Sequence, residues 1–303
     1  MYKLTAPNNI IFKIISLISI TFLLSCTNNS TQTIDYNNKN LINAMSAEPS
    51  NLIAMIAGDA ASSAISSKIF NSLIKYDDDL NYAPDIAESW KISKDQKTIT
   101  FKLKKGLVWS DNKPITSKDV MFTWKLITNP KTRTPYASDY LLVKKASTPD
   151  DFTFEVTYED NYAPALDTWA SLNILPQHIL KDEDINNTYF SREPLGSNYY
   201  KLSDWISGQQ ITLESNNNSI LGEAKISRLT SRIIPDTSSQ FLELTANNID
   251  LMNINPIQYK RVFPSKPKLQ KKINLFKELG NGYTYLGFNL KRAPFNDIRV
   301  RQA

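Results

Sequence analysis

The sequence predicts an α/β protein, with strands and helices mixed along the chain (α+β mixed) and arranged in two lobes. The chain has 303 residues, enough for about two domains of roughly 100–200 residues each. Segments with alternating apolar residues, typical of strands, lie between segments with apolar residues every three or four positions, typical of helices. No internal repeat recurs at a fixed period, which argues against a solenoid or a propeller.

The first predicted elements are a strand that begins near Leu41 and a helix over Ala60–Lys75. The strand ends before Pro49, because proline cannot donate a backbone hydrogen bond to a sheet. The helix carries apolar residues on one face at four-residue spacing, at Ile65, Ile69 and Leu73. Residues 76–90 then form a turn-rich connection.

A strand and a capped helix follow over residues 97–128. In the strand, apolar and polar residues alternate over KTITFKL. Thr116 and Asp119 have the spacing of a capping box, which predicts a helix start. One face of that helix carries Val120, Met121, Trp124 and Ile127. Because tryptophan buries a large apolar area, we expect core packing for Trp90, Trp109 and Trp124.

The remaining chain continues the same mixture of elements. Strands are predicted at residues 152–158 and 209–216, and a helix with a turn at 162–180. Residues 232–254 predict strand, helix and strand, and residues 283–290 predict a last strand. Pro294 and Asn296–Asp297 indicate a turn and a helix N-cap, after which only six residues remain. A helix that short is marginal.

Composition indicates a folded chain without a nucleic-acid partner. The chain is 41% hydrophobic and 21% charged, which is enough apolar content for a sizeable core. Its net charge is +5, and no long basic run is apparent.

The N-terminus has the pattern of a secretory leader. Lys3 and Lys13 precede the eleven-residue apolar run Ile14–Leu24, which is too short to cross a bilayer that needs about 20 apolar residues. We therefore predict a signal peptide over residues 1–25. Residues 23–26, Leu-Leu-Ser-Cys, resemble a bacterial lipobox, which implies cleavage before Cys26 and acylation of that residue. Residues 26–40 would then be a lipidated polar tether. The alternatives are an ordinary signal peptide that contains a cysteine, or a buried structural cysteine.

No motif indicates an enzyme, a metal site or a cofactor. His178 is the only histidine and Cys26 the only cysteine, so a zinc site of the usual kind is not expected. The sequence lacks the G-x-S-x-G elbow, the H-E-x-x-H pair and a glycine-rich phosphate loop. We expect His178 to lie at the surface or to cap a helix. A carboxylate or serine hydrolase remains a distant alternative.

Several blocks in sequence order carry a family resemblance. They are the segment 69–124, with APDIAESW and VWSDNKPITSKDV, then TPYASDYL (134–141), EPLGSNYYKL (193–202) and YLGFNLKRAPFNDIRVRQA (285–303). Together they resemble family 5 of the bacterial extracellular solute-binding proteins, the peptide- and nickel-type binding components of ABC importers. The resemblance runs from about residue 40 to the last residue. Asparagine stands where the family has turn glycines, at Asn112 and at Asn247–Asn248, and asparagine tolerates left-handed backbone better than most residues.

The resemblance implies a class II periplasmic-binding-protein-like fold of two lobes, with the C-terminal lobe missing. Lobe I would comprise residues 41–70 and 181–285, with residues 71–180 as an inserted subdomain. Residues 286–303 would start the truncated C-terminal lobe, because in the family the RVRQA helix opens that lobe. A split or decaying gene would explain such a truncation.

The function implied by the resemblance is substrate binding for an ABC importer. The protein would be a monomer, lipid-anchored at the periplasmic or extracytoplasmic face of a bacterial membrane, and would deliver peptides to ABC permease subunits. Peptide is favoured over nickel because the TPYAS and APFNDIRVRQA blocks lean toward peptide binders and a single histidine offers little to a transition metal. The alternative is a truncated remnant, or a non-transport surface lipoprotein, without ligand binding.

Five residues are the candidate ligand contacts. Glu48 and Ser50 lie in AEPSN (47–51), where the family loop meets ligand, and Tyr136 matches a loop tyrosine of oligopeptide binders. Tyr283 and Tyr285 lie at the crossing into the second lobe. Other roles compete: Glu48 as a solvated turn charge, Ser50 as a turn cap and Tyr285 as a core residue. The acidic group that takes the peptide amino terminus in the family belongs to the C-terminal lobe.

Overall fold

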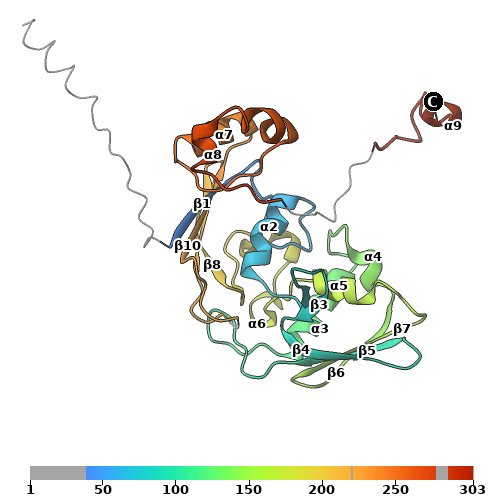
Figure 1. Cartoon of the computed structure of the whole chain (residues 1–303). Helices are drawn as coiled ribbons and strands as arrows, with labels where there is room; N and C mark the ends of the chain where they lie inside the picture. The colour runs from blue at the N-terminus through green and yellow to red at the C-terminus, as the bar shows by residue number, and fades with distance from the viewer. Residues whose placement is uncertain (1–38, 220, 278–285, 303) are drawn as a thin grey trace, which may run out of the picture.

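The computed structural model describes residues 39–219, 221–277 and 286–302, and it has two four-stranded sheets with helix α2 (Ala60–Ile69) between them (Figure 1). The first sheet has the strand order β1 (Asn40–Met45), β10 (Arg228–Ile233), β9 (Gln210–Ser215) and β8 (Tyr200–Ile206). Strand β1 is parallel to β10, and the other neighbours are antiparallel. This sheet therefore joins the start of the described chain to residues beyond 200.

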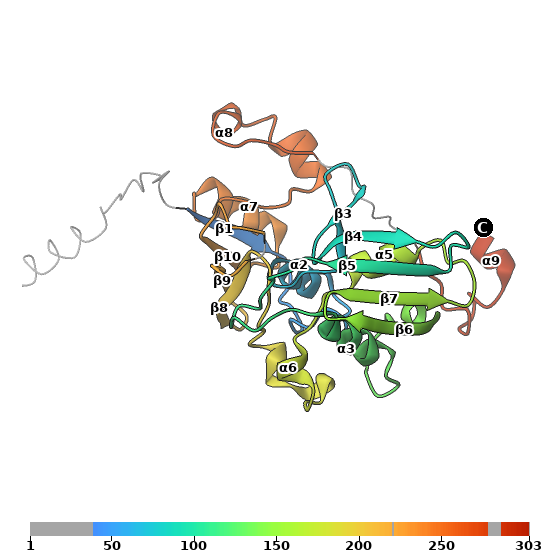
Figure 2. The same ribbon diagram turned by 90° about the horizontal axis from the view of Figure 1, so that it is seen from below.

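The second sheet is antiparallel, in the order β4 (Ala87–Ile92), β5 (Thr98–Leu103), β7 (Thr153–Tyr158) and β6 (Val143–Asp150). Helices α3 (Ser117–Thr128) and α5 (Ala165–Ser171) lie behind it in Figure 2. Trp169 of α5 is fully buried against Phe101 and Phe154, with ring centroids 6.1 and 5.1 Å away. The alternation predicted for β5 and β7 is confirmed, because their buried apolar side chains occupy every second position; the polar Thr153 at the start of β7 is buried as well.

Local helix signals in the sequence are also confirmed. Thr116 caps α3, and Asp119 completes the capping box. Val120 and Ile127 are buried, while Met121 and Trp124 are half-buried against the same core. Trp109 is fully buried and Trp90 packs at the edge of the core. Asn112 and Asn247 adopt φ values of 69° and 61°, so asparagine does occupy left-handed turn positions.

The predicted helix over Ala60–Lys75 is wrong at its C-terminal end, because α2 ends at Ile69. The next residues run extended into β2 (Ile74–Tyr76), which pairs with β3 (Tyr82–Pro84). Asp85 accepts hydrogen bonds from the Asn71 side chain and from the Ser72 backbone N–H, at 2.7 and 2.9 Å. These contacts hold the chain away from the helical path, and the helical spacing of Leu73 reflects only its burial in the core.

Two predicted strands are also absent from the described residues. After α7 (Thr237–Thr245), residue Leu251 forms only an isolated bridge with Asn43. The Asp250 carboxylate accepts the Ile42 N–H at 2.8 Å and takes the place of a ladder bond. The predicted strand 283–290 lies partly outside the described residues. Residues 286–290 form no strand and pair with none of the described strands.

Short elements complete the described chain: α4 (Ala137–Tyr140), α6 (Gln177–Leu180), η1 (Ile185–Asn187), η2 (Tyr189–Ser191), η3 (Gln258–Val262), α8 (Pro267–Gln270) and α9 (Ile298–Gln302). The predicted start of α9 is confirmed, because Asp297 accepts the Arg299 N–H at 2.9 Å. Among the described residues, no helix is long and apolar enough to span a membrane.

Candidate ligand-binding site

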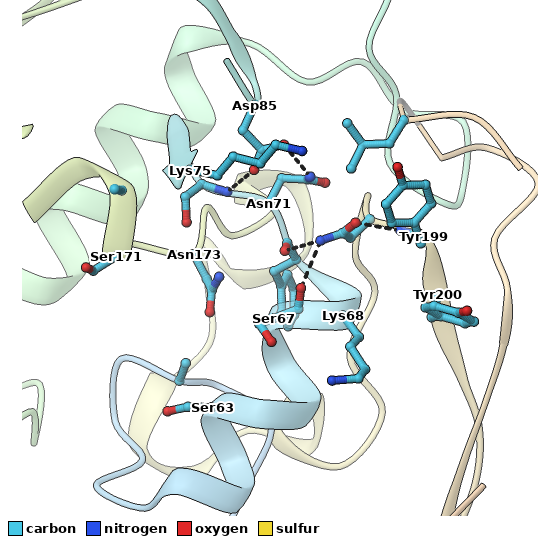
Figure 3. A pocket seen from close by; sticks show the side chains of 16 residues that line it. Ser63, Ser67, Lys68, Asn71, Lys75, Asp85, Ser171, Asn173, Tyr199 and Tyr200 are labelled. Carbon is cyan, nitrogen blue, oxygen red and sulfur yellow. Dashed lines mark hydrogen bonds between the residues drawn. The ribbon is translucent and has the colours of Figure 1, made fainter. Parts of the chain in front are cut away.

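Two adjoining hollows lie beside α2, with volumes of about 460 and about 380 Å³. They share four lining residues, Ala54, Ser63, Ser171 and Asn173, so they form one continuous depression where the end of α5 faces α2. Figure 3 shows the larger hollow, with Ser171 and Asn173 on one side of α2 and Tyr199 and Tyr200 on the other.

The larger hollow is lined mainly by neutral polar groups and two lysines. Ser63, Ser67 and Lys68 project from α2, and Lys75 lies on β2. Lys68 Nζ donates to the Ala64 carbonyl at 2.8 Å, and burial lowers the pKa of Lys68. An ammonium that is partly desolvated gains from an anionic partner, so Lys68 suits a ligand carboxylate.

Asp85 forms a buried wall of the larger hollow. Burial raises the pKa of Asp85, and the bonds from Ser72 and Asn71 offset that effect only in part. The carboxylate holds the segment after α2 in place.

The segment after Leu195 caps the C-terminal end of α2 with hydrogen-bond donors. Asn198 Nδ2 donates to the carbonyls of Ser67 and Phe70, both at 2.9 Å. The backbone N–H groups of Ser197 and Asn198 both donate to Ile69 O, at 3.0 and 2.9 Å. Helix C-termini leave their last carbonyls without intrahelical donors, and this segment supplies donors to them.

The smaller hollow is acidic and aromatic. Asp139 and Asp167 line it together with Tyr136 and Tyr140. The hydroxyl of Tyr82 donates to Asp167 Oδ1 at 2.7 Å, and the Tyr76 hydroxyl donates to the same oxygen. Both lysines of the depression therefore line the larger hollow, which also contains the buried Asp85, and the smaller hollow has two aspartates and no lysine.

Among the three predicted contacts that the structure describes, Glu48, Ser50 and Tyr136, only Tyr136 lines either hollow. Its hydroxyl donates to the Ala57 carbonyl at 3.2 Å, and 43% of the residue is exposed. Ser50 lies instead at the N-terminus of α2, where its Oγ donates to Asp59 Oδ2 at 2.6 Å. Tyr283, Tyr285 and Cys26 lie outside the described residues.

Glu48 also lies away from both hollows and connects the loop after β1 to the β8–β9 turn. Its carboxylate accepts from Trp205 Nε1 and Ser207 Oγ, both at 2.8 Å, and from Gly208 N at 3.0 Å. Burial alone would raise the pKa of Glu48, but these hydrogen bonds and the nearby Arg192 guanidinium lower it.

The sequence reasoning missed most residues of the depression, including Lys68, Asp85, Asn173 and Asn198. One signal for Asn198 was present, because it lies in the block EPLGSNYYKL (193–202), which carries part of the family resemblance. In the described ranges, no group of three or more His, Cys, Asp and Glu side chains could hold a metal ion. His178 Nε2 lies 2.9 Å from Asp111 Oδ2, so its ring is engaged at the surface.

Comparisons with known proteins agree with the motif blocks. The profile of the bacterial extracellular solute-binding proteins, family 5 (middle region), matches residues 81–303. The oligopeptide-binding protein AppA of Bacillus subtilis is 30% identical over 264 residues, which is 84% of this chain and 47% of AppA. The chain thus spans about half the length of the relatives it matches.

Solved structures show the same fold. NikZ from Campylobacter jejuni, in complex with Ni(L-His), superposes with a TM-score of 0.80 at 26% identity, over 88% of this chain and 52% of NikZ. AppA from Bacillus subtilis, in complex with a nonapeptide, gives 0.78 at 28% identity, over 87% of this chain and 52% of AppA. The predicted class II periplasmic-binding-protein-like fold is confirmed over the matched part. The chain belongs to family 5 of the bacterial extracellular solute-binding proteins, a family of binding proteins rather than enzymes.

Proposed function

We propose that this chain captures peptides outside the cytoplasmic membrane, as part of the substrate-binding component of an ABC importer, and delivers them to permease subunits. The observation that carries the proposal is the depression beside α2. Lys68 and Lys75 line its larger hollow together with the buried Asp85, and Asp139 and Asp167 line its smaller hollow. Relatives named as oligopeptide-binding proteins support the choice of peptide.

The chemistry of the depression fits a short peptide. A peptide has a carboxylate at one end, an ammonium at the other and amide groups between them. Lys68 would take the carboxylate, and Ser63 and Asn173 the amides between the two hollows. Asp139 would take the ammonium, a role that the family resemblance gives instead to an acidic group of the C-terminal lobe. Each hollow has a volume within the range of about 300–1,000 Å³ that is usual for ligand sites.

The candidate contact residues divide into two groups in this proposal. Tyr136 contacts the ligand from the smaller hollow, and Tyr283 and Tyr285 do so from the crossing into the second lobe. Glu48 and Ser50 hold the loop after β1 in place, since their side chains bond to the protein itself and line neither hollow.

A second lobe would complete the site by hinge closure, as in other two-lobed binding proteins. A cleft that closes around its ligand buries most of the ligand surface, so one lobe alone would bind more weakly. Cys26 would carry the lipid anchor and residues 26–40 would be the tether. Replacing Cys26 by serine should abolish incorporation of labelled fatty acid in a bacterial host, whereas retained incorporation would contradict the anchor.

Thermal melting of the full chain, with and without a pool of di- to hexapeptides, tests peptide binding. A ligand that binds only the folded state adds about 2.7 kcal/mol of stability at a hundredfold excess over its dissociation constant. We expect an upward shift that is reduced by Lys68→Gln and by Asp139→Asn. The matched control is Lys94→Gln, an exposed lysine in the turn between β4 and β5.

Two results would contradict the proposal. A cooperative melt that no peptide shifts would favour a surface lipoprotein or remnant without ligand binding. An equal loss of the shift in Lys94→Gln and Lys68→Gln would show that the depression is not the site.

A further inference from the structure

A strongly basic segment lies after α7. Residues 257–277, named here the basic surface, contain Lys260, Arg261 and five lysines between residues 266 and 277, and no aspartate or glutamate. Subtracting these seven charges from the net charge of +5 leaves −2 for the rest of the chain. The cations stand singly or in adjacent pairs, at Lys260–Arg261 and Lys271–Lys272, with neutral residues between them, so no long uninterrupted basic run marks the segment in the sequence.

All seven cations are exposed, and none forms an ion pair with a described acidic residue. The segment is held on the fold. Gln258 is buried and its Nε2 donates to the Thr237 carbonyl of α7 at 3.0 Å, while Lys266 Nζ lies 5.6 Å from the Phe241 ring centroid. Figure 1 shows α7 and α8 at one end of the molecule, with strands β4–β7 at the other. The positive charge of the basic surface therefore lies at the end of the molecule that contains α7 and α8.

Apolar side chains are exposed among the cations. Phe276 is 82% exposed and Ile257 64%, and Tyr259 and Leu275 are also exposed. Cations beside exposed aromatic and aliphatic residues are the composition of segments that lie in a membrane interface, where Lys and Arg meet headgroups and apolar side chains enter the acyl boundary.

We propose that the basic surface docks on a bilayer that contains anionic phospholipids. The cations would contact headgroup phosphates, and Phe276 and Ile257 would insert shallowly. This proposal rests on the exposed cations and the exposed apolar side chains of the basic surface, and it is independent of peptide binding and of an anchor at Cys26. A covering protein domain fits less well, because burying seven cations would need as many acidic partners.

Vesicle co-sedimentation of the full chain tests the proposal. Partition is compared between vesicles of phosphatidylcholine and vesicles that also contain phosphatidylglycerol, at low and high salt. The test variant replaces Lys266, Lys268, Lys271 and Lys272 by glutamine. The matched control replaces Lys91, Lys94, Lys131 and Lys145, four exposed lysines without a described ion pair. The leader is identical in all three proteins, so its contribution cancels.

We expect the full chain to prefer anionic vesicles, with a preference that falls at high salt. Each lysine near an anionic surface adds to the binding free energy. Replacing four of them should therefore reduce the preference for anionic over neutral vesicles at least about tenfold. The control variant should retain the preference, and Phe276→Ser should weaken binding to anionic vesicles at both salt concentrations.

Three results would overturn the proposal: no preference for anionic vesicles, an equal loss in both quadruple variants, or displacement from vesicles by a single-stranded oligonucleotide at lower concentration than by soluble phosphatidylglycerol. The last result would assign the basic surface to nucleic acid. Circular dichroism melts of each variant establish that a loss of binding is not a loss of folding.

Discussion

Replacing Gly196 by alanine should destabilise the fold strongly, although the change adds one methyl group. A Cβ at this position would lie 2.0 Å from the Ile69 carbonyl oxygen and 2.6 Å from Ile69 Cγ2. Real Cβ contacts are essentially never under 3.0 Å, so the backbone must move by at least about 1 Å. Ile69 and Ser197 are fully buried, which leaves little room for that movement.

The magnitude follows from the hydrogen bonds at this contact. Ser197 N and Asn198 N both donate to Ile69 O, and a shift of the segment weakens both bonds. Each bond contributes about 1 kcal/mol net, and a buried carbonyl left without a donor costs about 1–3 kcal/mol more. We expect Gly196→Ala to lower the free energy of unfolding by about 3 kcal/mol or more, a large part of the 5–15 kcal/mol typical of a domain.

Urea unfolding followed by circular dichroism measures this loss, with Gly58→Ala as the matched control. A Cβ at Gly58 would meet nothing within 4 Å, and its φ is outside the left-handed range. That substitution should be neutral or stabilise by up to about 1 kcal/mol, because it reduces the freedom of the unfolded chain. If Gly196→Ala were no more destabilising than Gly58→Ala, the reasoning that the close approach to Ile69 excludes a side chain at position 196 would be refuted.

Three further predictions concern single side chains. The pKa of Glu48 is lowered in the folded state, so its contribution to stability is present above pH 4.5 and is lost as the pH falls through the folded-state pKa. In Glu48→Gln the melting temperature should therefore fall less steeply with acid than in the unchanged chain. An equally steep fall in both proteins would contradict this role of Glu48. Asp119→Ala should lower the free energy of unfolding, measured in urea, by about 2 kcal/mol, because α3 loses its capping box and the Gln177 N–H loses its acceptor. A smaller loss than in the exposed control Asp182→Ala would refute this role of Asp119. Tyr136→Phe should cost less than about 1 kcal/mol in stability yet weaken peptide binding severalfold by calorimetry; unchanged affinity would remove Tyr136 from the proposed site.

Elements whose signals are local could be predicted from the sequence. The capping box of α3 lies within four residues, and the alternation in β5 repeats every second residue, so both were visible without knowledge of the fold. The end of α2 was not visible. It depends on Asp85, which lies beyond β2 and β3 and binds the chain just after the helix. Tertiary contacts of this kind override a helical pattern.

The depression was largely unpredictable for the same reason. Lys68, Asp139 and Asn198 come from segments about 60 residues or more apart, and none carries a distinctive local pattern. Tyr136 could be found because it lies in a motif block. The apolar spacing that suggested a longer α2 also placed Leu73 correctly in the core, since burial rather than helical structure produced the pattern.

Helix α2 connects these observations, because both of its ends are held by remote segments. At the N-terminus, Asp59 caps the helix and also accepts the Ser50 hydroxyl from the loop after β1. At the C-terminus, the segment that starts at Gly196 supplies donors to the last carbonyls. Lys68 therefore projects from a helix whose position is fixed before ligand arrives, which lowers the ordering cost of binding. It follows that Asn198→Ala, which removes donors from Ser67 O and Phe70 O, should weaken peptide binding through the position of α2 even if Asn198 never contacts the ligand.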